Sequence, residues 1–214
     1  MIRRGVLVSL LVAALGGGIP PRAAGIDAAS YRAATASGAI GGVAGRIYEE
    51  RKRPDTPDLP LTGAAVFVLP SSADVARQLE EIKRMARNSS DGYRAAAPSI
   101  LAVRRAYEKK LWDSGAGDLV KSTTVDANGR FSVPDLPAGD WLLVATYSVK
   151  VDKPSAAGVT KQRGVYTPRT HLTGFQRVTF WLREVTVTGG RLENLELTDR
   201  GAWFSGVVEE RAPD

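Results

Sequence analysis

The sequence contains no cysteine and only one histidine, His171, among its 214 residues. The absence of cysteine excludes disulfide bonds, thiolate metal sites, cysteine nucleophiles and a lipid-modified N-terminal cysteine. A single histidine excludes a multi-histidine metal centre such as that of a zinc peptidase. A Ser–His–acid triad would have to use His171, which lies in a polar segment where we expect a surface residue. The composition therefore excludes the catalytic chemistries that depend on cysteine or on several histidines.

Motifs for other kinds of active site are equally scarce. Residues 126–129 (DANG) resemble the start of a calcium loop, but the later ligands are missing and Arg130 adds a positive charge. We interpret them as a hairpin turn. No glycine-rich phosphate loop follows an expected strand, and neighbouring carboxylates such as Glu80 and Glu81 point in different directions on a helix. We therefore predict no catalytic residue, no metal and no cofactor, and a small hydrolase is the least favoured function.

The longest apolar run stands at the N-terminus. Residues 1–18 carry two arginines at positions 3 and 4, continue with an apolar stretch and end in three glycines, which predicts an export signal peptide. The run is shorter than the ~20 residues of a transmembrane helix, so no membrane span is expected after its removal. Cleavage after Gly16 and cleavage after Ala36 both remain open, as does an uncleaved anchor. We expect a flexible leader over 19–41 and a periplasmic or extracellular location.

The charge balance does not indicate nucleic-acid binding. The formal net charge is +6, but three of the basic residues lie within or beside the signal, which leaves about +3 for the folded part. The remaining basic residues are scattered, and their short pairs fall on expected helices. Solvated helix faces explain them more simply than a groove that follows phosphates.

Short apolar runs separated by turn residues predict about seven strands. Residues 43–48, 63–69 and 141–149 are examples, and 201–208 is a candidate edge strand. Apolar side chains occupy both faces of 141–149, which is typical of a central strand that is covered on both sides. The pattern predicts a mainly β fold, an antiparallel Ig-like or prealbumin-like β-sandwich over residues 42–208, followed by a short tail at 209–214.

Residues 71–115 interrupt the strand pattern with two amphipathic helices, which predict an αα-hairpin inserted into the sandwich. We place Pro98 in the first turn of the second helix, where proline is tolerated. Each apolar stripe must be buried. The simpler interpretation packs the helices on each other and on the sheet. In the alternative, part of the stripe docks a partner, with Tyr93 or Trp112 at its edge.

Two further aromatic residues and one long loop are candidates for binding. Trp181 lies on the opposite face of its strand from Phe180, and Trp203 lies in the terminal segment. Exposed tryptophan can stack on sugar rings or anchor a protein contact. The alternative is that these tryptophans cover the inserted helices. Residues 150–173 are polar and predict a long loop, which is either mobile or functional.

Several segments together resemble the carboxypeptidase regulatory-like domain. They are residues 45–47 (GRI), 61–68 (LTGAAVFV), 124–133 (TVDANGRFSV) and 136–144 (LPAGDWLLV), with VTVTGG and NLEL near the end of the chain. The resemblance implies a prealbumin-like (transthyretin-like) sandwich, usually non-catalytic and attached to many different proteins. The inserted helices are not part of the usual pattern, and Trp141 stands where the family commonly has tyrosine.

These observations predict an exported, non-catalytic β-sandwich that acts as a binding or accessory module. We expect it to contact another protein of the cell envelope through its helical insertion. The alternative is a carbohydrate-binding module that uses Trp181, Trp203 or residues 150–173.

Overall fold

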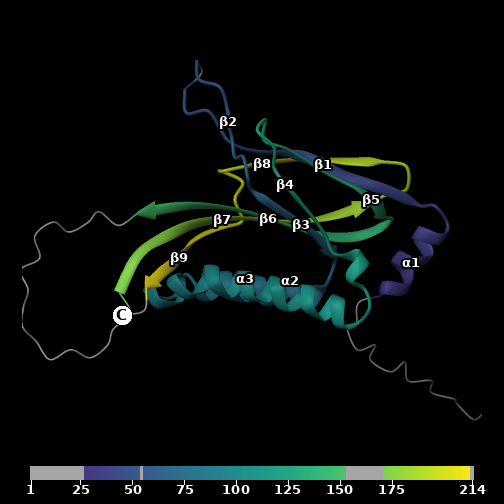
Figure 1. Ribbon diagram of the computed structural model, residues 1–214, viewed down its shortest axis with the longest axis horizontal. Coiled ribbons are helices and arrows are strands. Elements are labelled where there is room, and N and C mark those ends of the chain that lie inside the picture. Colours follow the sequence, from purple (N-terminus) through teal and green to yellow (C-terminus); the bar gives the residue numbers. More distant parts are fainter. Residues whose placement is uncertain (1–26, 54, 153–170, 213–214) are drawn as a thin grey trace, which may run out of the picture.

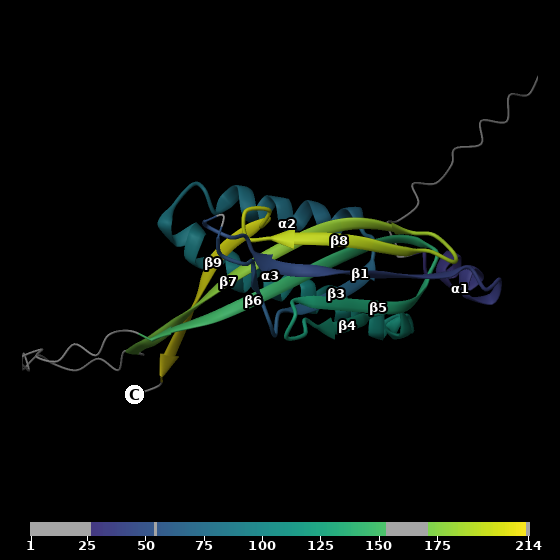
Figure 2. The same cartoon turned by 90° about the horizontal axis from the view of Figure 1, so that it is seen from above.

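The computed structural model describes residues 27–53, 55–152 and 171–212, which fold into three layers (Figure 1). A four-stranded sheet lies on a five-stranded sheet, and a helical hairpin covers the outer face of the five-stranded sheet. Seen from above, the strands and the two long helices run roughly along the long axis of the molecule (Figure 2). The expected signal peptide, residues 1–18, lies outside the described residues.

The described residues form nine strands, three α-helices and one short 3-10 helix. In chain order these are α1 (Ala28–Ala36), β1 (Ile40–Glu49), β2 (Leu59–Pro60), β3 (Ala65–Pro70), α2 (Ala73–Met85), α3 (Ser90–Asp113), η1 (Gly117–Leu119), β4 (Lys121–Thr124), β5 (Arg130–Pro137), β6 (Gly139–Asp152), β7 (His171–Val187), β8 (Leu192–Thr198) and β9 (Phe204–Ala212).

Strand β1 is the centre of the four-stranded sheet. It pairs antiparallel with β2 and β5 and parallel with β8. Its Gly45 permits a close approach of the neighbouring strand, since a Cβ at this position would lie 2.2 Å from the carbonyl oxygen of Leu195 and 2.9 Å from the ring of Phe131. A side chain at position 45 would therefore push β8 or the Phe131 ring out of place.

The five-stranded sheet has the order β4-β3-β6-β7-β9 with antiparallel neighbours. Its long strands β6 and β7 have 14 and 17 residues, whereas β1 has 10. At about 3.3 Å per residue, β6 is roughly 46 Å long and β1 roughly 33 Å. One end of the five-stranded sheet therefore projects beyond the four-stranded sheet, on the side away from α1 (Figure 1).

The two faces of the five-stranded sheet contribute to two separate apolar layers. Trp141, Leu143 and Trp181 face the four-stranded sheet, and the indole nitrogen of Trp181 donates to the carbonyl oxygen of Thr198 at 2.7 Å. Val144 and its neighbour across the ladder, Phe67, face the hairpin. This confirms the expected fold class, a mainly β sandwich with a helical insertion. Residues 141–145 are buried and form the predicted central strand covered on both sides, whereas Ser148 and Val149 are exposed, so the expected cover does not extend to 149.

The described part of the expected flexible leader, 19–41, begins at residue 27 and contains the helix α1. Helix α1 is held by Tyr31, whose buried ring meets Trp141 edge-on with 5.0 Å between ring centres. The Tyr31 hydroxyl donates to the carbonyl oxygen of Asp140. One buried side chain leaves little periodicity in the sequence, so the helix was not expected.

Helix α3 begins earlier than predicted. The Ser89 hydroxyl accepts the backbone N–H of Gly92 at 2.9 Å, so Ser89 is the N-cap and Pro98 lies in the helix interior rather than in the first turn. Pro98 is exposed, so the carbonyl group that loses its helical partner lies on the solvent side of the helix.

Three boundaries near the C-terminus also differ from expectation. Strand β6 continues to Asp152 and β7 begins at His171, so the loop is shorter than the predicted 150–173, and residues 153–170 lie outside the described part. Strand β7 is continuous to Val187 where two short strands were expected. The edge strand β9 runs to Ala212, so most of the expected tail at 209–214 is strand.

Candidate functional site

Trp181 does not provide an exposed platform. Its side chain has 0% relative exposure and lies between the sheets, bonded to the carbonyl oxygen of Thr198. The alternative that it covers the helices is also wrong, because β7 points Phe180 toward the hairpin and Trp181 away from it. The alternation along the strand was correctly predicted, but the sequence did not show which face meets the helices.

Trp203 connects the start of β9 to helix α2. Its indole nitrogen donates to Glu80 Oε1 at 2.7 Å, and the Lys83 Nζ lies 4.7 Å from the centre of its ring. Both partners come from α2, one helical turn apart. Trp203 therefore covers part of the helical insertion, and its polar atom is already hydrogen-bonded.

Tyr93 and Trp112 lie at the two ends of α3 and do not form one patch. Tyr93 is 42% exposed and its ring centre lies 6.2 Å from that of Phe204. Trp112 is 64% exposed and covers Gly117, where a Cβ would come within 2.1 Å of the indole ring. Nineteen residues of α-helix separate them by about 28 Å.

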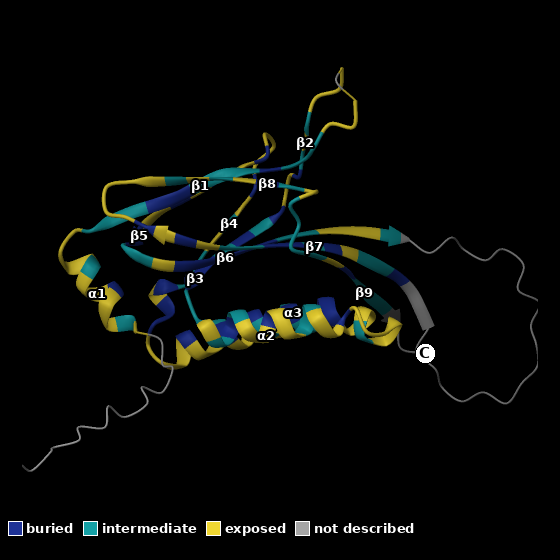
Figure 3. Cartoon of the chain, turned by 180° about the vertical axis from the view of Figure 1, so that it is seen from behind, coloured by how far each residue is buried: buried dark blue, intermediate teal, exposed yellow. Residues whose placement is uncertain are grey.

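The apolar stripe of the hairpin is buried on the five-stranded sheet. Figure 3 shows buried positions on the sheet side of the helices and exposed ones on the outer side. The outer side carries ion pairs one turn apart, such as Arg77 with Asp74 and Arg84 with Glu81. The stripe itself is therefore not a surface for a partner. Its buried members are Val75, Leu79, Ala96, Ala97, Ile100, Tyr107 and Leu111.

A groove opens where the five-stranded sheet projects beyond the four-stranded one. It has a volume of about 360 Å³. Six of its lining residues belong to the inner face of the five-stranded sheet, and three come from the end of the four-stranded sheet. They are Tyr147, Val149, Arg177, Thr179, Trp181 and Ser205 on the first side, and Glu49, Leu61 and Asp199 on the second. The groove is thus the mouth of the space between the sheets.

The walls of this groove combine an apolar surface with charges of both signs. Val149 is exposed, Tyr147 is half-buried, and the buried Trp181 forms the inner end. Arg177 is exposed on the β7 side. On the other side, Asp199 accepts the backbone N–H of Glu50 at 2.9 Å, which fixes the position of its carboxylate. Such a mixture is typical of ligand sites.

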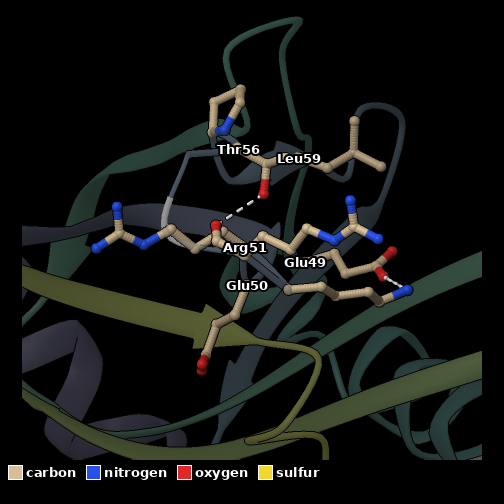
Figure 4. A pocket seen from close by; sticks show the side chains of 8 residues that line it. Glu49, Glu50, Arg51, Thr56 and Leu59 are labelled. Carbon is tan, nitrogen blue, oxygen red and sulfur yellow. Dashed lines mark hydrogen bonds and ion pairs between the residues drawn. The ribbon is translucent and has the colours of Figure 1, made fainter.

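A second hollow of about 280 Å³ adjoins the groove and is formed by the loop between β1 and β2 (Figure 4). Its polar groups bind one another: Lys52 Nζ lies 2.8 Å from Glu49 Oε1, and the Thr56 hydroxyl donates to the carbonyl oxygen of Arg53 at 2.9 Å. All its lining residues come from positions 49–59, so it belongs to one loop. Glu49 also lines the groove, and the loop therefore borders the groove.

The described residues hold neither a candidate metal site nor a candidate transmembrane helix. No group of three or more histidine, aspartate or glutamate side chains in the described ranges is arranged to hold a metal ion. Among the helices of the same residues, none is long and apolar enough to cross a membrane.

Comparison with known proteins adds little to this description. No family model matches the chain, and no curated protein matches it. One similar solved structure is a candidate carbohydrate-binding protein from Pseudomonas aeruginosa, with 16% identity and a TM-score of 0.36 over 75% of this chain and 88% of that chain. Another is the minor pilin of the Gram-positive pathogen Streptococcus agalactiae, with 11% identity and a TM-score of 0.26 over 81% of this chain and 97% of that chain. These values carry no assignment of function, and the resemblance to the carboxypeptidase regulatory-like domain is supported only as far as the β-sandwich fold.

Proposed function

We propose that this chain is an exported, non-catalytic binding module whose contact site is the groove at the open end of the sandwich. The observation that carries the proposal is the mismatch in sheet length, because it leaves the inner face of β6, β7 and β9 without the cover that the four-stranded sheet gives elsewhere. Concave surfaces with apolar walls and a few polar groups are the usual ligand sites of proteins.

The helical hairpin is a structural layer in this proposal. Its apolar stripe is buried on the sheet, and Trp203 is bonded to α2. A contact with another envelope protein through the hairpin would have to use its charged outer side. Exposed ion pairs contribute little binding energy, so the groove is the better candidate for the same partner.

A hydrolase would need two carboxylates that converge in the groove. Glu49 and Asp199 both line it, but Glu49 is ion-paired with Lys52 and Asp199 accepts the N–H of Glu50. Each carboxylate is thus already engaged by another group of the protein, and the described part of the structure shows no pair of them directed at a common point in the groove. Binding without catalysis is therefore favoured.

Export rests on residues 1–18, which are outside the described part of the chain. The position of Tyr31 bears on the site of cleavage, since cleavage after Ala36 would remove α1 and uncover Trp141. We therefore favour cleavage after Gly16. Mass spectrometry of the protein from its host tests this, and a mature N-terminus beyond Tyr31 would contradict it.

Recovery of binding partners from the envelope fraction of the host tests the groove. Tyr147→Ser with Val149→Ser removes its apolar wall, and we expect partner recovery to fall at least about tenfold, which corresponds to ~1.4 kcal/mol. Trp112→Ala on the hairpin is the matched control and should leave recovery unchanged. Loss of partners in the Trp112 variant alone would overturn the proposal in favour of the hairpin.

A further inference from the structure

We propose that the ligand of the groove is a neutral glycan chain. This inference rests on the function proposed above and adds the chemical class of the ligand. It is argued from three properties of the groove: its apolar wall, the hydrogen-bonding groups around that wall, and the balance of charge.

The apolar wall suits the C–H face of a sugar ring. Tyr147 and Val149 stand two residues apart on β6 and therefore on the same face of the sheet, and Trp181 lies further in. An aromatic ring with an apolar neighbour offers a surface on which a pyranose can stack, while the Tyr147 hydroxyl remains a polar group at the edge. Trp181 is fully buried and its indole N–H is donated to Thr198, so it supports the inner end of the groove from below and offers no surface to the ligand.

The polar groups of the groove match sugar hydroxyls. A sugar hydroxyl is both a donor and an acceptor, so it is best satisfied by a wall that contains both kinds of group. Thr179 and Ser205 present hydroxyls 3.5 Å apart from neighbouring strands. Arg177 supplies donors only, and Asp199 supplies acceptors from the opposite side.

The charges in the groove favour a neutral ligand. Arg177 lies on one side, and Asp199 and Glu49 on the other, with the charge of Glu49 balanced by Lys52. A site for an anionic polymer would show clustered arginine and lysine, and a site for a cationic one would show clustered carboxylates. Neither sign dominates here.

The backbone around the groove favours a glycan over an extended peptide. A peptide that adds to a sheet as a further strand needs an unpaired strand edge. Arg177 and Thr179 lie on β7, which is paired with β6 on one side and β9 on the other over this length. Among the described residues, β6 has no partner on its other side beyond Thr146, and β9 is an edge strand, but a peptide added at either edge would lie in the plane of the sheet and not over Arg177 and Thr179. A ligand that lies over these residues meets side chains on a sheet face, and this is how a sugar chain is held.

An NMR titration of the full mature chain tests the inference. The probes are neutral oligomers of glucose, mannose, galactose and N-acetylglucosamine, with polygalacturonate as the anionic comparison. At about 10 mM, which reveals binding near a Kd of 1 mM, we expect at least one neutral oligomer to shift the amide signals of Val149, Thr179 and Ser205, which line the groove. Tyr147→Ala should weaken that binding at least about tenfold, or ~1.4 kcal/mol. Tyr93→Ala, on the opposite side of the five-stranded sheet, should not change it.

Three results would overturn the inference. They are no shift of the Val149, Thr179 and Ser205 signals with any neutral oligomer, stronger binding of polygalacturonate than of the neutral oligomers, and shifts that survive Tyr147→Ala. If a protein partner is lost in the Tyr147 and Val149 variant and no neutral oligomer binds, the ligand is not a glycan. The proposed function would still hold in that case. If the variant leaves partner recovery unaffected and no neutral oligomer binds in the groove, the proposed function itself is removed.

Discussion

The guanidinium carbon of Arg104 lies 3.8 Å from the centre of the Phe67 ring, so a cation of α3 is stacked on an aromatic side chain of β3. Arg104 is only 9% exposed and forms an ion pair with Glu108 one turn further on. Burial lowers the pKa of Arg104, while the carboxylate of Glu108 opposes that shift. The layer between the hairpin and the sheet is therefore not wholly apolar, and its cation depends on a single neighbouring carboxylate.

The first prediction concerns this ion pair. Glu108→Gln leaves the buried cation without its counter-charge and should lower the free energy of unfolding by about 1–3 kcal/mol. Replacing both partners, with Arg104→Met and Glu108→Gln, keeps the volume and removes the charge, so the double variant should be more stable than the single one. Urea denaturation measures both. A double variant that is less stable than Glu108→Gln would contradict this account of the interface.

The second prediction concerns alkaline pH. The Tyr107 hydroxyl donates to the carbonyl oxygen of Pro70 at 2.9 Å, and burial raises the pKa of Tyr107 from 10.0 to about 12. The folded state thus favours the neutral phenol. This contribution to stability is complete below the unfolded pKa and is lost as the pH rises from 10 through about 12.

Tyr107→Phe distinguishes the loss of stability caused by ionisation of Tyr107 from any loss caused by the other tyrosines. The variant should be about 1 kcal/mol less stable than the wild type near neutral pH, because it lacks the hydrogen bond to Pro70. Unfolding in urea at a series of pH values should show the difference shrinking above pH 10. A difference that stays constant up to the pH at which both proteins unfold would show that Tyr107 does not titrate in this way.

The third prediction compares two glycines in strands. Gly45→Ala places a methyl group 2.2 Å from the carbonyl oxygen of Leu195, so we expect a loss of at least about 2 kcal/mol from strain between β1 and β8. Gly174→Ala is the matched control, since the nearest atom would be 3.5 Å away and its φ is not positive. It should change stability by less than about 1 kcal/mol. Thermal unfolding measures both, and equal effects would contradict the described packing of β8 on β1.

Local patterns were sufficient to predict much of the fold. Apolar residues on both faces of 141–149 predicted a strand covered on both sides, because successive side chains of a strand lie on opposite faces. The prediction holds for 141–145, which are buried. The stripe through Val75 and Leu79 predicted a buried helix face for the same kind of reason. Helix α1 was missed because only Tyr31 is buried, and the continuity of β7 was missed because Arg183 and Glu184 interrupt its apolar run.

The groove could not be predicted from the sequence. Its walls come from positions as distant as Glu49 and Ser205, which lie in different sheets and meet only after folding. The groove also forms only because β6 and β7 are longer than the strands that the sequence predicted for these segments. Trp181 was a candidate because of its residue type, yet the direction in which β7 faces the two layers is decided by the packing of the sheets.

The protein contacts its binding partner either through the open end of the sandwich or through the hairpin. Photo-crosslinking in the host distinguishes the two most directly. A photo-reactive benzoylphenylalanine is substituted at Tyr147 in the groove or, in a second strain, at Trp112 on α3. The account predicts a crosslinked adduct from position 147 and none from position 112 after irradiation of intact cells. An adduct from position 112, with none from position 147, would contradict it.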